Sequence, residues 1–199
     1  MGRSFYIIFF IALLYGAWVN WPKSSPHSIH SIQVGVPTSV SSSSSLTAYS
    51  PSAGVKITEL ERYSGEFRIL GRENYHYGVE AQFSPVDFAV GWGDMAKPEI
   101  YSQIQISQGN RWYRWRTDSE PPISLQAIAS QSANMHMIPA NEEVGKMLQK
   151  VKADDVVYLN GALVEIEMDN GWRWRSSLSR EDTGAGACEL MRVDQVRIL

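Results

Sequence analysis

The chain has 199 residues, which is enough for one globular domain and some additional segments. Its residues are 44% hydrophobic and 20% charged, a composition that excludes disorder over the whole length. The net charge is −3, and the single cysteine, Cys188, excludes an internal disulfide and a zinc site built from several thiolates. No glycine-rich phosphate loop, zinc-protease motif or EF-hand loop occurs, so we expect neither a cofactor nor a metal.

The N-terminus carries an apolar run, residues 5–21, without a charged residue. A membrane-spanning helix needs about 20 apolar residues, roughly 17 at the short end, so we predict a transmembrane anchor within residues 1–23. Trp18 and Trp21 suit the lipid headgroup layer at one end, and Arg3 precedes the other. A cleaved signal peptide is the alternative, although Trp18 stands where processing prefers a small side chain. The charges at the two ends slightly favour a cytoplasmic N-terminus.

Residues 24–54 are rich in serine, with a run at 41–45, and contain no Asp, Glu, Lys or Arg. Such a segment has too little apolar surface to offset the entropy of ordering, so we predict a flexible, disordered tether. His27 and His30 lie within it. Because no third ligand is near, we interpret them as solvated linker residues rather than a metal site.

From about residue 55 the sequence becomes patterned, which predicts one globular domain over 55–199. All 21 Asp and Glu residues lie in it, and leaving out Arg3 and Lys23 gives 16 Lys and Arg, a net charge of −5. A general nucleic-acid binder usually has a basic excess, so nucleic acid is not an expected partner.

Within the domain, a strand is predicted over 65–72, where apolar and polar residues alternate. The residues Ser-Pro-Val-Asp at 84–87 combine an N-cap, a proline at the first helical position and an acid three residues after the cap. They predict a short helix that ends near Gly91 or Gly93. The aromatic-rich segment 111–116 predicts a second strand.

Two helices are predicted next, over 124–133 and 141–151. Asn141 is an N-cap residue, and two glutamates in the first turn complement the positive end of the helix dipole. Apolar residues recur at the spacing of one buried helical face, namely Val144, Met147, Leu148 and Val151.

The last third of the chain is predicted to be β-rich. Asn170 and Gly171 favour a type I′ hairpin turn, because both residue types tolerate positive φ angles. After this turn Trp172 and Trp174 share one strand face, which we expect to be core. The predicted strands are 156–167, 171–178 and 188–198.

Two resemblances extend this description. The segment Asp154–Val164 resembles the entry strand of OB-like barrels, in which a central glycine lets the strand bend. A longer pattern consists of residues 170–178, Arg180, 182–184, 186–189 and, upstream, 132–136. It is similar to a family of uncharacterised bacterial membrane-anchored proteins. This resemblance covers about residues 65–196 and implies an envelope setting without an activity.

Two motifs suggest catalysis. Asp182-Thr183-Gly184 has the letters of an aspartic-protease loop, but the lobe that would carry a flap and cleft is missing, so we interpret it as a glycine-rich loop. The better candidate is a thiol nucleophile, Cys188, activated by His136 with Asn134 orienting the ring. The structural alternative is a small buried cysteine in a strand and a histidine in a loop between two helices.

The two arginine–tryptophan strands, 111–116 and 171–175, are candidates for binding. Interleaved aromatic and cationic side chains suit stacked ligands, although a stripe of indoles is more often core and the arginines can pair with glutamates across the sheet. The candidate binding residues are Arg173, Arg175, Arg114 and Arg116.

We therefore predict an α+β protein with an N-terminal transmembrane helix, a disordered tether, and a small antiparallel β-sheet or OB-like barrel with two or three inserted helices. The expected function is a non-catalytic module of the envelope that binds a protein or a surface ligand, and a thiol-dependent hydrolase using Cys188 and His136 is the alternative. We expect a single-pass protein of the inner membrane, attached through residues 5–21, with its C-terminal domain outside the cytoplasm. An envelope protein is the expected partner.

Overall fold

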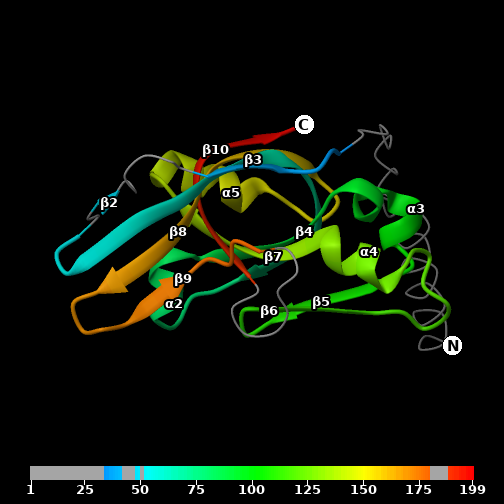
Figure 1. The fold of residues 1–199 in the computed structure, drawn as a ribbon, viewed down its shortest axis with the longest axis horizontal. Helices are drawn as coiled ribbons and strands as arrows, with labels where there is room; N and C mark the ends of the chain where they lie inside the picture. The colour runs from blue at the N-terminus through cyan, green and yellow to red at the C-terminus, as the bar shows by residue number, and fades with distance from the viewer. Residues whose placement is uncertain (1–33, 42–47, 50–51, 180–187) are drawn as a thin grey trace, which may run out of the picture. The chain divides into compact units, whose positions relative to one another are not determined.

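The computed structural model describes residues 34–41, 48–49, 52–179 and 188–199, all of which belong to one compact unit, Ile32–Leu199. This unit is mainly β-sheet with a few short helices, which confirms an α+β fold dominated by strands (Figure 1). The predicted membrane segment 5–21 and most of the predicted tether lie outside the described residues. Within the described ranges, no helix has the length and apolarity needed to cross a membrane.

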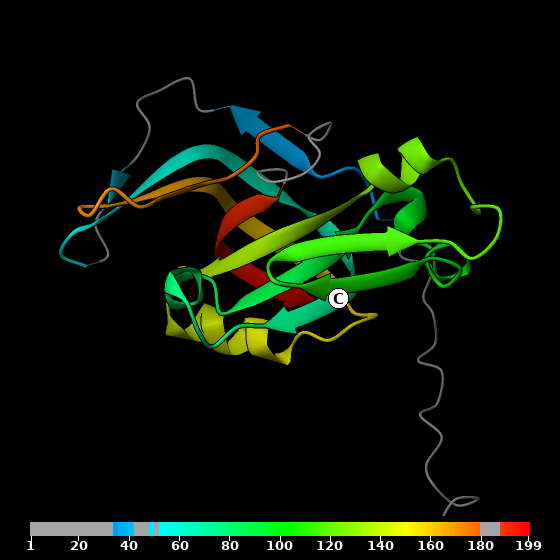
Figure 2. The ribbon, with the colours of Figure 1, turned by 90° about the horizontal axis from the view of Figure 1, so that it is seen from below.

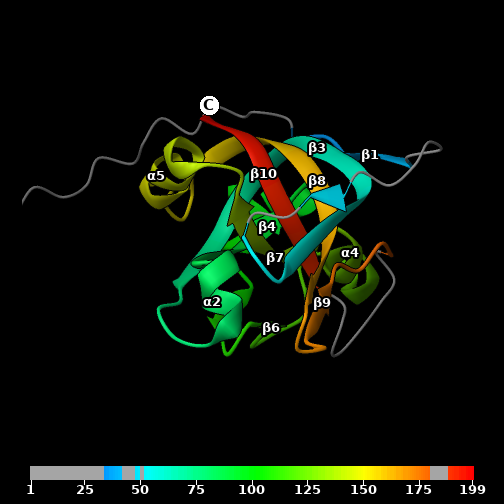
Figure 3. The same cartoon turned by 90° about the vertical axis from the view of Figure 1, so that its left-hand side faces the viewer.

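Five strands form a closed ring of pairings. β3 pairs antiparallel with β4, β4 pairs antiparallel with β7, and β7 pairs parallel with β10. β10 then pairs antiparallel with β8, and β8 returns to β3, so the sheet closes on itself (Figure 1, Figure 3). The five strands are β3 (Val55–Asn74), β4 (Val86–Gly91), β7 (Ser132–Pro139), β8 (Val156–Met168) and β10 (Glu189–Ile198).

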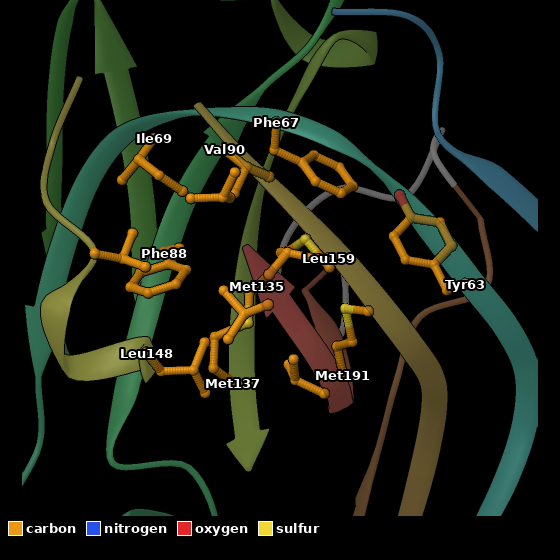
Figure 4. Close-up of a cluster of buried hydrophobic side chains, with 14 of the residues drawn as sticks. Tyr63, Phe67, Ile69, Phe88, Val90, Met135, Met137, Leu148, Leu159 and Met191 are labelled. Carbon is orange, nitrogen blue, oxygen red and sulfur yellow. The ribbon is translucent and has the colours of Figure 1, made fainter. Parts of the chain in front are cut away.

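The ring encloses the main hydrophobic core, shown in Figure 4. Alternate residues of each strand point inward, as strand geometry requires. On β4 these are Val86, Phe88 and Val90, and on β7 they are Met135 and Met137, all nearly or completely buried. The central core therefore consists mostly of aliphatic, methionine and phenylalanine side chains contributed by strands that are far apart in sequence.

Helix α5 (Glu142–Lys150) confirms the predicted helix over 141–151. The Asn141 side chain accepts a hydrogen bond from the backbone N–H of Val144, and the buried Val144 and Leu148 side chains join the core inside the ring. At the other end of the helix, the Arg72 guanidinium donates to the carbonyl oxygens of Gln149 and Val151. A cation is favoured there because the last carbonyls carry partial negative charge.

The predicted helix at 84–91 is wrong, because Val86–Gly91 forms strand β4. All six residues of β4 are buried, since the inner face lines the core and the outer face is covered by other segments. The run therefore shows no alternation. Ser84, predicted as an N-cap, instead follows helix α2 (Val79–Phe83), and its backbone N–H donates to the Glu80 carbonyl at the end of that helix.

His136, which we placed in a loop between two helices, lies in the middle of strand β7. The predicted helix over 124–133 is confirmed only in its first part, as α4 (Leu125–Ser130), with the Ser124 side chain as the N-cap. From Ser132 the chain is extended. Side chains on both faces of this strand are buried, so its apolar residues do not follow the period of a half-buried strand.

The hairpin turn after β8 also differs from the prediction. Gly171 has a φ of 86°, but Asn170 does not adopt a positive φ, so the loop is a three-residue turn that ends in a left-handed glycine. A turn with two left-handed central residues occurs instead between β5 and β6, where Asn110 and Arg111 have φ angles of 52° and 66°. These two strands are β5 (Gln105–Gly109) and β6 (Trp112–Arg116), which form a separate two-stranded sheet.

Residues upstream of the predicted domain start at 55 also contribute to the fold. The Val34 side chain is only 3% exposed and belongs to the central core, and its carbonyl accepts a hydrogen bond from Gly93. Strand β1 (Thr38–Ser41) pairs with Glu61–Ser64 of β3, which precede the residues of β3 that pair with β4. The remaining elements are β2 (Ala48–Tyr49), η1 (Gly93–Ala96), α3 (Pro98–Tyr101) and β9 (Arg173–Arg175).

Candidate functional site around Asp87

Asp87 is a carboxylate on the outer face of the ring that has no exposed surface. Its neighbours on β4, Val86 and Phe88, point into the core, so Asp87 points outward. Its polar contacts come both from covering segments and from the neighbouring strand β7, because a buried charge is tolerated only when it is paired and hydrogen-bonded. These contacts are Arg111 Nη1 at 2.6 Å and Ser84 Oγ at 3.4 Å to Oδ1, and His136 Nδ1 at 2.9 Å and Asn134 Nδ2 at 3.5 Å to Oδ2.

Arg111 brings the tip of the β5–β6 hairpin to this carboxylate. Its second terminal nitrogen, Nη2, donates to the Ser84 carbonyl at 2.8 Å, and its guanidinium carbon lies 3.7 Å from the centre of the Tyr75 ring. The backbone is engaged as well: the N–H donates to the Tyr75 hydroxyl at 2.9 Å, and the carbonyl accepts from Asn134 Nδ2 at 3.3 Å. The left-handed backbone of Arg111 is thus held by contacts at both its main chain and its side chain.

His136 lies directly opposite Asp87 in the β4–β7 ladder and is 4% exposed. His136 Nδ1 lies 2.9 Å from Asp87 Oδ2 and makes no hydrogen bond to a described residue. On its other side, the His136 ring packs at 4.8 Å against the Trp174 ring.

Aromatic side chains cover this cluster. Phe83 stacks on Trp172 with ring centres 5.8 Å apart, and Trp172 meets Trp174 edge-on at 6.1 Å. Trp174 in turn lies 5.6 Å from the Arg111 guanidinium. We predicted Trp172 and Trp174 as core, but both are only partly buried and pack on a second cluster outside the ring, which contains Ile57, Ile138, Ile166 and Leu190 among others.

The structure brings Cys188 and Asn134 into contact. Cys188 Sγ lies 3.9 Å from Asn134 Nδ2 and 3.8 Å from the Arg111 carbonyl oxygen. Within the described ranges, no hydrogen bond or ion pair joins Cys188 to His136, whose Nδ1 faces Asp87. Burial has the largest effect on the Cys188 thiol and the nearby Glu189 carboxylate the next largest, and together they raise its pKa to about 11. The surroundings therefore favour the protonated thiol over the nucleophilic thiolate.

The four candidate binding arginines fall into two pairs. Arg173 and Arg175 both pair with Glu165, at 2.7 and 2.6 Å, and Arg173 also approaches Glu167. Arg114 and Arg116 instead lie on the exposed face of β6 together with Trp112, which is 38% exposed. Nε of Arg116 donates to Gln105 Oε1 across the hairpin, whereas its 4.0 Å approach to Asp118 is a weak, exposed pair.

The hairpin is fixed at its base as well as at its tip. Ile106 and Trp115, on the inner face of the two strands, pack against a third cluster that contains the buried Met95, Ile104 and Ile128. Gln108, also on the inner face, donates to Asn134 Oδ1 at 2.8 Å. Figures 1 and 2 show β5 and β6 lying against the side of the ring that contains β7. The inner face of the hairpin is therefore packed against the rest of the unit, which holds its outer face in place.

Comparisons with protein-family models, curated proteins and solved structures give no match to this chain. The site must be interpreted from its own chemistry. Its carboxylate is paired with a guanidinium, its imidazole is covered by an indole, and its thiol has a raised pKa. Among the described residues, no group of three or more His, Cys, Asp or Glu is arranged to hold a metal ion.

Asp87, Arg111 and Tyr75 are the site residues that sequence reasoning missed. One signal was present: Asp87 is the only charge in an otherwise apolar run, and a carboxylate there needs a partner once both faces of the strand are buried. The position of Arg111 between Asn110 and Trp112 was a weaker signal. An Asn in the first position of a two-residue turn favours a hairpin, but it does not tell which carboxylate the next residue reaches.

Proposed function

We propose that this unit is a non-catalytic module of the cell envelope that binds an anionic surface ligand on the outer face of the β5–β6 hairpin. The observation that carries the proposal is the exposed row Trp112, Arg114 and Arg116 on β6. Alternate residues on a strand lie about 7 Å apart on the same face, so one indole and two guanidinium groups form a continuous strip.

This strip suits a polymer that carries both flat apolar faces and negative groups, such as an acidic polysaccharide. An indole face stacks on the apolar face of a sugar ring, and a guanidinium fork binds carboxylate, sulfate or phosphate oxygens. The anchored hairpin adds a further advantage, because a surface that is already ordered loses less entropy on binding. Arg173 and Arg175 are less suited to this role, since both are engaged by Glu165.

We also propose that the ring is an OB-like barrel. In support, its strands close in the order β3, β4, β7, β10, β8. Along the chain, α5 lies between β7 and β8, which are the third and fourth of these five strands in sequence. Such barrels bind ligands over the second and third strands and the adjacent loops. The corresponding surface here is the outer face of β4 and β7, where Asp87 and His136 lie under the hairpin.

The alternative function, a thiol-dependent hydrolase, has less support. It needs the Cys188 thiolate beside an imidazole that accepts its proton. Instead, burial raises the thiol pKa to about 11, and the His136 Nδ1 faces Asp87. Two of the side chains that suggested catalysis, Asn134 and Cys188, instead contact the Arg111 carbonyl of the hairpin.

The proposed setting remains the inner membrane, with residues 5–21 as a single-pass anchor and the barrel outside the cytoplasm. The support is the apolar run itself. Carbonate extraction of membranes tests this proposal. We expect the full chain to remain in the pellet; release of a product that begins after residue 17 would instead indicate a cleaved signal peptide.

The binding proposal is tested with the full chain in a nonionic detergent, by titration with dextran sulfate and with uncharged dextran. We expect binding to the sulfated polymer alone, and a loss of affinity of about tenfold or more in the double variant Arg114→Ala/Arg116→Ala. The variant Trp112→Ala should weaken binding independently of salt. The control, Arg173→Ala/Arg175→Ala, removes the same number of charges from the other pair, whose side chains are 62% and 52% exposed. Equal losses in both double variants would mean that binding depends on charge alone and would contradict the proposed surface.

A further inference from the structure

The Arg111 guanidinium is bound through both of its terminal nitrogens and through one flat face. The Asp87 carboxylate accepts from Nη1, the Ser84 carbonyl accepts from Nη2, and the Tyr75 ring stacks on the flat face. A planar fork with two donors and a stackable face fits this arrangement, whereas an ammonium group is a compact point charge and cannot use all three contacts. The surroundings of Asp87 are therefore selective for arginine-like cations.

The groups that receive the guanidinium belong to the barrel and its loops. Asp87 lies on β4, Ser84 lies just before it, and Tyr75 follows the end of β3. Arg111 comes from the β5–β6 hairpin, which forms a separate two-stranded sheet. The site and the arginine that fills it thus belong to different structural elements, and the hairpin that carries Arg111 is not hydrogen-bonded into the main sheet as a strand.

From this we propose that the barrel has a guanidinium-binding site, formed by Asp87, Ser84 and Tyr75, which Arg111 fills as an internal ligand and for which an arginine side chain of a partner protein competes. The Arg111 side chain is 17% exposed, so the site borders solvent. Its left-handed backbone belongs to the two-residue turn of the hairpin, so the guanidinium is presented from the tip of a protruding element. The proposal does not depend on the anionic ligand proposed above.

Competition has a structural consequence for the hairpin. When another guanidinium occupies the site, the Arg111 N–H loses the Tyr75 hydroxyl, and the Arg111 carbonyl loses Asn134 and Cys188. The tip is then released, while the base stays packed on the third cluster through Ile106 and Trp115. Binding of an arginine should therefore speed up the hydrogen exchange of the backbone amides near the turn, between Gln108 and Tyr113.

The first experiment empties the site. The full-length Arg111→Ala variant, in detergent, is titrated with methylguanidinium and with methylammonium at equal ionic strength while the melting temperature is followed. We expect methylguanidinium to raise the melting temperature with a half-saturation about tenfold or more below that of methylammonium, and the double variant Asp87→Asn/Arg111→Ala to lose this preference. Equal effects of the two cations on the single variant would overturn the proposed site.

The second experiment tests competition in the unaltered chain, and it also decides the case if Arg111→Ala does not fold. Hydrogen exchange of the hairpin amides is measured with the peptide Gly-Arg-Gly and with Gly-Lys-Gly at the same concentrations. We expect faster exchange near the turn with the arginine peptide only, with unchanged exchange in α5 as the internal control. Unchanged hairpin exchange at saturating arginine peptide would show that Arg111 is a permanent anchor and would overturn the proposed competition.

Discussion

Replacing Asp87 with Asn should destabilise the barrel strongly, because it removes the negative charge that the Arg111 guanidinium faces. The pair is buried: Asp87 is completely inaccessible and the Arg111 side chain is 17% exposed, with 2.6 Å between Nη1 and Oδ1. Removing one partner of a buried ion pair costs about 3–5 kcal/mol, since the other charge is left without compensation. Because some of Arg111 still reaches water, we expect about 3 kcal/mol, the lower end of this range.

A double-mutant cycle separates this loss from a general effect of substitution. Arg111→Met removes the cation and keeps an unbranched side chain, so the double variant Asp87→Asn/Arg111→Met contains no unpaired buried charge. We expect it to lose less stability than the sum of the two single variants by about 1–3 kcal/mol. Additive losses would mean that the two residues do not stabilise each other.

The assay is urea unfolding of residues 32–199, followed by tryptophan fluorescence and circular dichroism. Arg173→Ala is the surface control, because the Arg173 side chain is 62% exposed and should contribute about 0.5 kcal/mol or less. A loss below about 1 kcal/mol for Asp87→Asn would refute the view that this carboxylate holds the hairpin against the barrel.

Four further predictions follow from the described contacts. Alkylation of Cys188 by iodoacetamide should be slow at neutral pH and rise about tenfold per pH unit until the pH approaches about 11, because thiolate forms only near the raised pKa; a plateau near neutral pH would instead support an activated nucleophile. Trp174→Ala should cost roughly 3 kcal/mol in urea unfolding, the lower end for a large aromatic, since this indole is only partly buried. Val34→Ala should cost about 1.5 kcal/mol if the N-terminal arm packs as described, and no loss would show that the arm does not contribute. Asn141→Ala should cost about 1 kcal/mol through loss of the helix cap, whereas Asn141→Asp should restore most of it.

The elements that sequence analysis predicted correctly have strong local signals. Helix α5 has a capping residue, acidic residues in its first turn and one apolar face, and all of these are properties of neighbouring residues. Strand β4 was missed because the opposite holds: both of its faces are buried, so its residues do not alternate, and the local signature at Ser84 resembled a helix start. Burial in the tertiary structure outweighed local propensity there.

The candidate site was only partly predictable for a related reason. Asn134 and Cys188 lie near each other because β7 and β10 pair in parallel and place Glu189 beside Met135. That register is set by the closed ring and has no counterpart in neighbouring sequence. Asp87 reaches His136 through the β4–β7 ladder, and Arg111 arrives from a hairpin whose docking position is equally non-local.

The long strand β3 has a consequence for how the chain folds. It pairs with β4, which follows it closely, but also with β8, so that Val55 lies opposite Met168, more than half the chain away. Contacts between residues so distant in sequence form slowly, because a large loop must close before they can stabilise anything. During synthesis the β8-facing edge of β3 has no partner until β8 emerges, and an unpaired edge is a site of aggregation. Assembly of this barrel is therefore expected to be slow and to depend on protection of β3 from other chains.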